Sequence, residues 1–215
     1  MKKTDKSRKT GNILIAVGAI LIASAMVIVF YNLFASKNAE KKSEDILLKM
    51  DIPTTDEART PDYELSPDVG MPEIEIDGVF CIAVVEIPKL GIKLPVLSEC
   101  TKQNLKIAPC RYTGSAYTDD LVIAGHNYLY HFRNIGNLMQ GDSVIITDMD
   151  GNKFNYVVSA TDVLQPTDVE DMTKGEWPLT LFTCDYSGQT RITIRCDRLN
   201  ETVSTETVTA SDYQQ

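Results

Sequence analysis

The hydrophobic positions of the chain follow two patterns: one long run near the N-terminus, and many short runs from about residue 74 onward. The long run, Ile13–Tyr31, contains no charged residue. Its length is close to the ~20 residues that a helix needs to cross a hydrocarbon core. We therefore predict one transmembrane helix at residues 13–34, after a basic tip at residues 1–12.

A cleaved signal peptide is the alternative interpretation of this segment. Ala23-Ser24-Ala25 resembles a small-residue cleavage site after a short apolar run. However, the apolar run continues through Met26–Phe30, where a cleaved signal normally becomes polar. The pattern therefore favours an uncleaved signal anchor.

The segment between this anchor and residue 75 has a different composition. Residues 36–50 are rich in Lys, Glu and Ala, which predicts a charged helical stalk. Residues 51–74 contain four prolines among Thr, Asp and Glu, which predicts an extended spacer. We expect this stalk and linker, residues 35–75, to hold the following domain away from the membrane.

Short runs of β-branched and aromatic residues fill the next segment, separated by turn residues. They occur at residues 80–87, 92–97, 121–124, 143–147, 153–160, 179–183 and 190–196. The turn Asp148-Met149-Asp150-Gly151 between two of these runs predicts a hairpin. Such spacing, with little helical periodicity, predicts an all-β barrel or sandwich over residues 76–205, followed by a polar tail at 206–215.

The charge distribution supports an orientation across a membrane. The net charge is −9, but the first nine residues carry five basic side chains and one acidic one, so the remainder carries −13. The positive-inside rule then places residues 1–12 in the cytoplasm and the β domain outside. The acidic body has no basic stripe, which argues against nucleic-acid binding.

Five cysteines, at positions 81, 100, 110, 184 and 196, bear on possible disulfides and metal sites. An odd number in an exported domain leaves at least one thiol unpaired. The spacing of Cys100 and Cys110 would allow a disulfide without establishing one. No CxxC pair or His/Cys ligand spacing is present, so we expect no structural zinc and no cofactor.

Cys184 is the cysteine in a position that suits a nucleophile. It ends the apolar run Leu179–Thr183 and is followed at once by the turn Asp185–Gly188. A thiol at such a junction is held by a rigid element and still reaches the surface. Arg191 follows seven residues later on the next strand-like run, where it could stabilise an oxyanion and favour the thiolate.

His126 is the candidate proton carrier. It follows the apolar run Leu121–Ala124 and Gly125, again at a predicted strand end, and imidazole is well suited to proton transfer near neutral pH. The other histidine, His131, lies in an aromatic stretch and is better interpreted as a packing residue. From residue types alone, a Cys/His/Arg enzyme and a structural β module with a buried thiol both remain open.

Several motifs resemble those of the sortase family. Thr180-Leu181-Phe182-Thr183-Cys184 is similar to the TLxTC signature, Thr190-Arg191 to the arginine strand that follows it, and Ala124-Gly125-His126-Asn127 to the histidine motif. The segments Ile87–Val96 and Gly136–Asp142 are similar to the family's IPKxxIxLPV and GD stretches. These motifs occur in family order across about residues 76–198.

The resemblance implies a closed eight-stranded β-barrel with short helices, and a cysteine transpeptidase with His126, Cys184 and Arg191 as its catalytic residues. The expected substrate is a secreted protein with an LPxTG-like sorting signal, cleaved between Thr and Gly through a thioacyl intermediate on Cys184. The acceptor would be an amine of a peptidoglycan precursor or of a pilin lysine, and the enzyme would be anchored in the cell membrane.

The resemblance also bears on the subclass. Pilin-polymerising sortases often carry an Asp-Pro-aromatic lid and a C-terminal membrane segment, and neither Asp51-Ile52-Pro53 nor the polar residues Ser204–Gln215 match these. Gln165–Pro178 is short for the long helix of class B. We therefore expect a class D-like or other anchoring enzyme, with a pilin polymerase or a non-catalytic, membrane-tethered binding module as alternatives. Glu99 could ligate calcium, as in some class A members, but a solvated carboxylate is the better interpretation.

Overall fold

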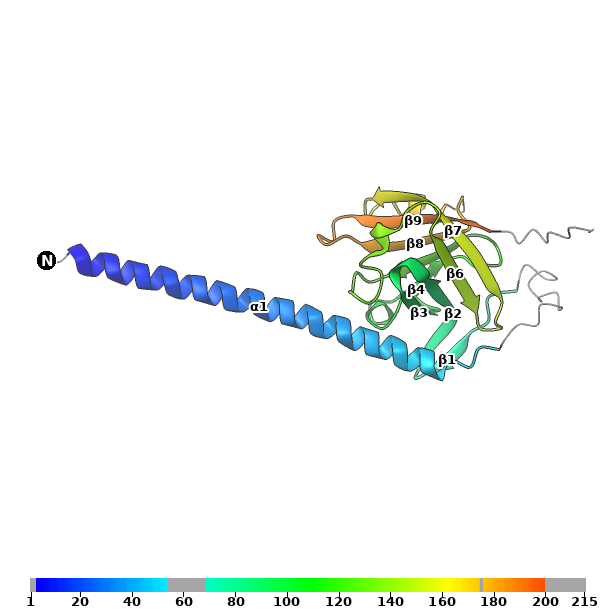
Figure 1. Cartoon of the computed structure of the whole chain (residues 1–215), viewed down its shortest axis with the longest axis horizontal. Coiled ribbons are helices and arrows are strands. Elements are labelled where there is room, and N and C mark those ends of the chain that lie inside the picture. The colour runs from blue at the N-terminus through cyan, green and yellow to red at the C-terminus, as the bar shows by residue number, and fades with distance from the viewer. Residues whose placement is uncertain (1–2, 54–68, 175, 200–215) are drawn as a thin grey trace, which may run out of the picture.

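The computed structural model describes residues 3–53, 69–174 and 176–199, with side chains from Gly11 onward. It consists of one long N-terminal helix and a β-barrel that lies beside the C-terminal part of this helix (Figure 1). Much of the predicted Pro-rich spacer (residues 54–68) and the predicted polar tail (residues 206–215) lie outside the described residues.

The N-terminal helix, α1, runs without interruption from Lys3 to Lys49. Its large apolar side chains between Ile13 and Phe34 are exposed. By length and composition the helix can cross a membrane, and its exposed apolar side chains are suited to contact with lipid.

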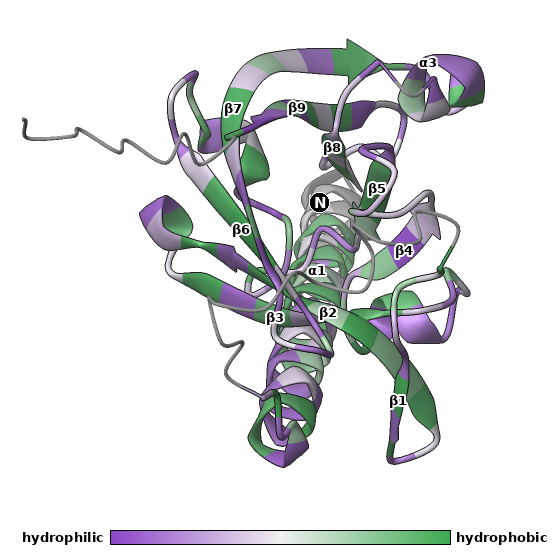
Figure 2. Cartoon of the chain, turned by 90° about the vertical axis from the view of Figure 1, so that its right-hand side faces the viewer, coloured by the Kyte–Doolittle hydropathy of each residue, from purple (hydrophilic) through white to green (hydrophobic). Residues whose placement is uncertain are grey.

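Nine strands follow, and eight of them close into a barrel. Their bounds are β1 Ile74–Ile76, β2 Val79–Ile87, β3 Ile92–Leu97, β4 Cys110–Thr113, β5 Leu121–Gly125, β6 Ser143–Asp148, β7 Lys153–Leu164, β8 Leu179–Cys184 and β9 Arg191–Arg198. The order is β1-β2-β3-β4-β5-β8-β9-β7-β6, and β6 pairs back with β2 to close the ring, leaving β1 as an edge strand. The ring is visible in a view along the long axis of the molecule (Figure 2).

The predicted closed eight-stranded barrel is therefore confirmed. Among the described residues from 69 onward its helices are short: α3, Val169–Thr173, and 3₁₀ turns at Pro88–Leu90, Asn104–Lys106 and Ile135–Asn137. The interior is filled by buried aliphatic and aromatic side chains, among them Ile82, Ile87, Leu121, Ile123, Phe132, Ile146, Phe154, Tyr156, Leu179 and Leu181.

A second apolar cluster lies outside the barrel, on the outer faces of β2 and β3, and α1 packs there mainly against β3. Ile46 of α1 packs in this cluster with Cys81, Val84 and Leu97. Because β2 is thereby buried on both faces, five consecutive residues from Cys81 to Val85 are buried, and an uninterrupted apolar run replaces the usual alternation.

The expected stalk, residues 36–50, is helical and packs along the barrel. Ser36, Ala39, Ser43 and Ile46 are each less than 5% exposed. Their spacing of three or four residues places them on one face of the helix. Three of the four are small, which allows the helix to approach the strands closely. The Ser43 hydroxyl also donates a 2.6 Å hydrogen bond to the Ile107 carbonyl.

This close packing can be tested by enlarging the small residue at its centre. We expect Ala39→Leu to lower the free energy of unfolding by about 1–3 kcal/mol, because extra methylenes cannot be accommodated in a packed interface. Thermal unfolding of the full chain in detergent measures the effect. Asn38→Leu, at an exposed neighbouring position, is the control, and an equal effect of both substitutions would contradict the described packing.

Candidate active site

Three strand ends meet at one edge of the barrel. β5 and β8 are parallel neighbours, with Gly125 opposite Thr183. The next residues, His126 directly after β5 and Cys184 at the end of β8, therefore lie on neighbouring strand ends. β9 is antiparallel to β8, and its first residue, Arg191, lies opposite Cys184. The structure therefore brings the three predicted residues together on adjacent strands.

A cavity of about 470 Å³ opens at this edge, and His126, Cys184 and Arg191 are among its lining residues. Cys184 is partly exposed. The rest of the wall is largely apolar and includes Leu105, Tyr112, Val169, Met172 and Phe182. The ring of Tyr112 stands edge-on to that of Phe182, with centroids 5.3 Å apart. A partly exposed thiol in the wall of an apolar groove is an arrangement that suits an extended peptide substrate.

Arg191 is held by the turn that connects β8 and β9. Its Nη1 donates to the carbonyls of Gly188 and Thr190 at 3.3 and 3.1 Å. A guanidinium has five N–H donors, so these bonds fix its position and leave donors for an oxyanion in the cavity.

His126 is oriented by an aromatic ring rather than by a carboxylate. Its imidazole stacks on Tyr128, with centroids 3.8 Å apart and planes inclined by 14°. Within the described part of the chain its Nδ1 is buried and has no hydrogen-bond partner. Burial, together with the nearby Lys106 cation, lowers the pKa of His126 below its usual value. The lowered pKa favours the neutral imidazole, which is the form able to accept a proton.

A hydrogen bond connects the two loops that carry the histidine and the cysteine. The Asn127 side chain donates from Nδ2 to the Asp185 carbonyl at 3.0 Å. Because Asn127 follows His126 and Asp185 follows Cys184, this bond fixes the spacing of the two candidate catalytic residues.

His131 is outside the cavity lining and is fully buried, as its interpretation as a packing residue predicts. Its Nε2 lies 3.4 Å from the Ser43 Oγ of α1. Since Ser43 donates its own proton to Ile107, its oxygen can only accept from His131. Burial, and the neighbouring His126, lower the pKa of His131 to about 4.

Arg195 holds one wall of the groove in place. This buried arginine donates to the Asp162 carboxylate at 3.0 Å, to the Thr180 hydroxyl at 3.2 Å and to the Asp171 carbonyl at 2.7 Å. Asp171 belongs to α3, which contributes Val169 and Met172 to the groove. These hydrogen bonds of Arg195 thus link α3 to the barrel.

The remaining cysteines are all free thiols. Cys100 lines the groove, and a hydrogen bond with the Cys110 thiol lowers its pKa, whereas that bond and burial raise the pKa of Cys110. Glu99, considered above as a calcium ligand, is exposed. Among the described residues, no three His, Cys, Asp or Glu side chains are grouped to hold a metal ion.

Comparison with known proteins gives a consistent result. Residues 85–199 match the family model for the sortase domain. Sortase A of Bacillus anthracis is 25% identical over 186 residues, which cover 80% of this chain and 83% of that protein. The sortase D5 transpeptidase of Clostridium perfringens has the same fold, with a TM-score of 0.54 and 21% identity over 75% of this chain and 98% of that one. Sortase C-1 of Actinomyces oris has a TM-score of 0.52 at 20% identity, covering 77% of this chain and 99% of that one.

The closed mixed barrel and the groove at its strand ends define a sortase-type fold. The chain belongs to the sortase family, because the family model matches more than half of its length. It is accordingly a transpeptidase-type enzyme with a helix suited to membrane anchoring.

Several residues around the site were not predicted from the sequence. Tyr128, two positions after His126, is close enough in sequence that an aromatic stacking partner could have been considered. Lys106, Tyr112 and Met172 come from separate segments of the chain, and only the closed barrel brings them to the groove.

The stacking of His126 on Tyr128 can be tested by removing the ring. We expect Tyr128→Leu to lower kcat/KM about 10-fold or more, because the imidazole loses the contact that orients it. Tyr128→Phe keeps the ring and should retain most of the activity. Cleavage of a sorting-signal peptide measures both, and equal losses in the two variants would contradict a role for stacking.

The buried neutral His131 predicts a pH-dependent stability. The unfolded chain protonates this imidazole near pH 6.5 and the folded chain only near pH 4. Folding stability contributed by His131 should therefore fall as the pH drops through this window, by about 3 kcal/mol in total. Urea unfolding of residues 36–215 between pH 7 and pH 4 measures the loss.

His131→Gln is the matched variant for this measurement, since an amide can donate in place of Nε2 but does not titrate. We expect a shallower loss of stability in the variant than in the parent. Parallel pH curves for the two proteins would contradict the assignment of a depressed pKa to His131.

Proposed function

We propose that this sortase cleaves an LPxTG-like sorting signal between Thr and Gly and transfers the protein to an amine acceptor of the cell wall. The observation that carries the proposal is the register of three neighbouring strands. It places His126, Cys184 and Arg191 together at one end of an apolar groove.

The proposed reaction has two acyl-transfer steps. The Cys184 sulfur attacks the Thr carbonyl carbon, its proton passes to His126, and the Arg191 guanidinium stabilises the tetrahedral oxyanion. His126 then gives its proton to the Gly nitrogen as the Thr–Gly bond breaks, which leaves a thioester on Cys184. In the second step the incoming amine attacks the thioester carbonyl carbon and gives a proton to His126; the C–S bond then breaks, and His126 returns the proton to the Cys184 sulfur.

The shape of the groove supports recognition of an extended peptide. Leu105, Tyr112, Phe182, Val169 and Met172 form an apolar wall beside the thiol. We propose that the apolar residues at the start of the sorting signal lie against this wall, which Arg195 holds through α3.

We also propose that α1 is a signal anchor with a cytoplasmic N-terminus and that residues 76–205 form an extracellular catalytic domain. The charge pattern supports this orientation, with five basic residues among the first nine. The acceptor is a peptidoglycan-precursor amine. Among its described residues, the connection after β7 contains one helix, the five-residue α3. This short helix supports a class D-like anchoring sortase rather than a class B sortase.

The deciding experiment incubates residues 36–215 with an LPxTG-type peptide and a glycine-type amine and analyses the products by mass spectrometry. We expect cleavage after Thr and incorporation of the amine. Cys184→Ala should give neither product. Cleavage by Cys184→Ala equal to that by the parent would overturn the mechanism, and product without amine would indicate a hydrolase.

The proposed role of Arg191 has its own test in this assay. We expect Arg191→Ala to lower kcat about 10²–10³-fold, because the oxyanion loses its charged donor. Gln189→Ala, in the same exposed turn, should retain parent activity. Equal rates for the two variants would exclude Arg191 from the reaction.

A further inference from the structure

The position of the barrel along α1 is set by contacts that occur in order along the helix. The Leu129 amide donates to the Ser36 hydroxyl at 3.2 Å, Ser43 binds the Ile107 carbonyl, and Lys49 forms an ion pair with Asp77 at the far end. The helix has no break between its apolar part and these contacts. The barrel is therefore held at a fixed height above the apolar segment.

The loop that follows the candidate histidine marks the lower end of the barrel. Ser36 is five residues beyond Tyr31, the last residue of the uncharged run, and a helix rises about 1.5 Å per residue, so the separation is about 7–8 Å. The headgroup region on each side of the hydrocarbon core has a similar thickness. The Leu129–Ser36 hydrogen bond therefore holds this loop close to the end of the apolar run.

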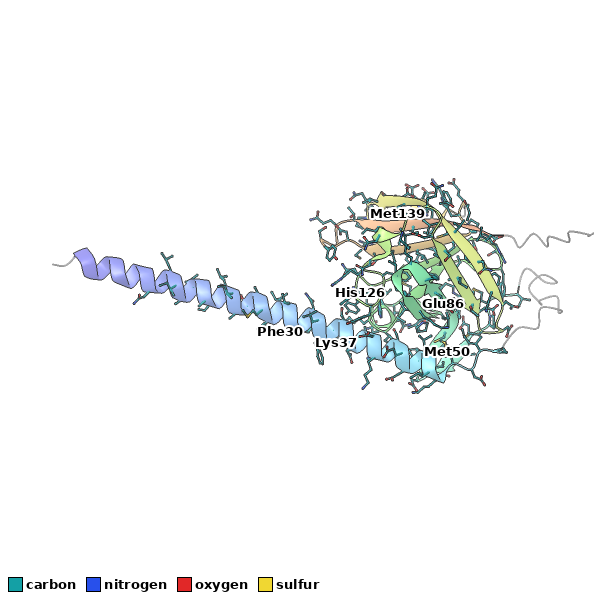
Figure 3. The ribbon with its side chains drawn as sticks, viewed as in Figure 1. Phe30, Lys37, Met50, Glu86, His126 and Met139 are labelled. Carbon is teal, nitrogen blue, oxygen red and sulfur yellow. The ribbon has the colours of Figure 1, made fainter. Side chains whose placement is uncertain are left out.

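The candidate catalytic edge lies at this same lower end. The parallel ends of β5 and β8 and the start of β9 are there, and the Asn127 amide joins the histidine loop to the β8–β9 turn. In Figure 1 this turn points toward the N-terminal part of α1. Figure 3 shows His126 on the side of the barrel that faces the segment from Phe30 to Lys37.

Four side chains at this edge are of the kinds that concentrate at a membrane interface, beside polar residues of the β8–β9 turn such as Ser187 and Gln189. Tyr186 is 79% exposed, and Leu129 and Tyr130 are each 37% exposed. The Arg133 guanidinium lies over the Tyr186 ring at 5.6 Å. Aromatic rings and arginines concentrate where headgroups meet hydrocarbon, because each offers both an apolar surface and a polar group.

We propose that the catalytic edge, through Leu129, Tyr130, Arg133 and Tyr186, rests on the lipid headgroups of the membrane that α1 crosses. The inference rests on the proposed anchoring by α1. It specifies that the substrate is cleaved while it is still held in the bilayer, with the scissile bond at headgroup height.

Tryptophan quenching in vesicles tests the position of the edge directly. The single tryptophan, Trp177, precedes β8 and is at the opposite end of that strand from Cys184. The full chain carrying Trp177→Phe and Tyr186→Trp is reconstituted in phosphatidylcholine/phosphatidylglycerol vesicles that contain brominated lipids, and the parent chain with Trp177 is the matched control.

We expect the tryptophan at position 186 to be quenched several-fold more strongly than Trp177. Equal or absent quenching at both positions would overturn the proposal. Blue-shifted emission at position 186 without lipid quenching would also overturn it, because a second protein copy would then cover the edge.

A change in helix length separates this inference from the proposed function. Seven helix-forming residues inserted after Phe34 raise the barrel by about 10 Å and nearly preserve its rotation about the helix axis. We expect unchanged turnover of a soluble sorting-signal peptide and at least a 10-fold loss with a substrate anchored by its own transmembrane segment.

Unchanged turnover of both substrates, or equal losses on both, would contradict the height assignment. Failure of the uninserted parent on the soluble peptide would instead contradict the proposed function. The two hypotheses therefore fail through different observations.

Discussion

The parallel pairing of β5 with β8 is the constraint on which the site depends. A register shift of one residue in this pair would turn either His126 or Cys184 to the other face of the sheet. The register is supported by close packing beside it. A Cβ atom at Gly125 would lie 2.3 Å from the ring of Phe132, so only glycine lets this core aromatic residue pack against the strand end. The histidine loop is thereby fixed on the barrel core.

Burial and stacking, rather than an acidic partner, define the electrostatics of the site. His126 has a lowered pKa and a ring held by Tyr128, and Arg191 supplies a permanent cation at the other side of Cys184. An imidazole whose neutral form is favoured, next to a cysteine and a permanent cation, is an arrangement that suits acyl transfer. Burial also lowers the pKa of His131, which lies where α1 meets the barrel.

The sequence was informative wherever a pattern is local. Strand-like runs with turn residues between them indicated the β domain, and the ordered motifs around His126, Cys184 and Arg191 implied the barrel and the residues that the structure brings to one groove. The packing of α1 was not predictable in this way. Its contact face consists mainly of Ser36, Ala39 and Ser43, small residues that hydropathy does not distinguish from an exposed surface. Tyr112, Met172 and Lys106 are distant in sequence, and only closure of the barrel makes them neighbours of the site.

The packing of α1 outside β2 and β3 has a consequence for the integrity of the barrel. Cys81 and Val84 lie in the apolar cluster that Ile46 of α1 helps to cover, and without the helix more of this apolar surface would be open to water or to another chain. Loss of α1 would therefore expose apolar surface on the barrel as well as remove the long apolar segment.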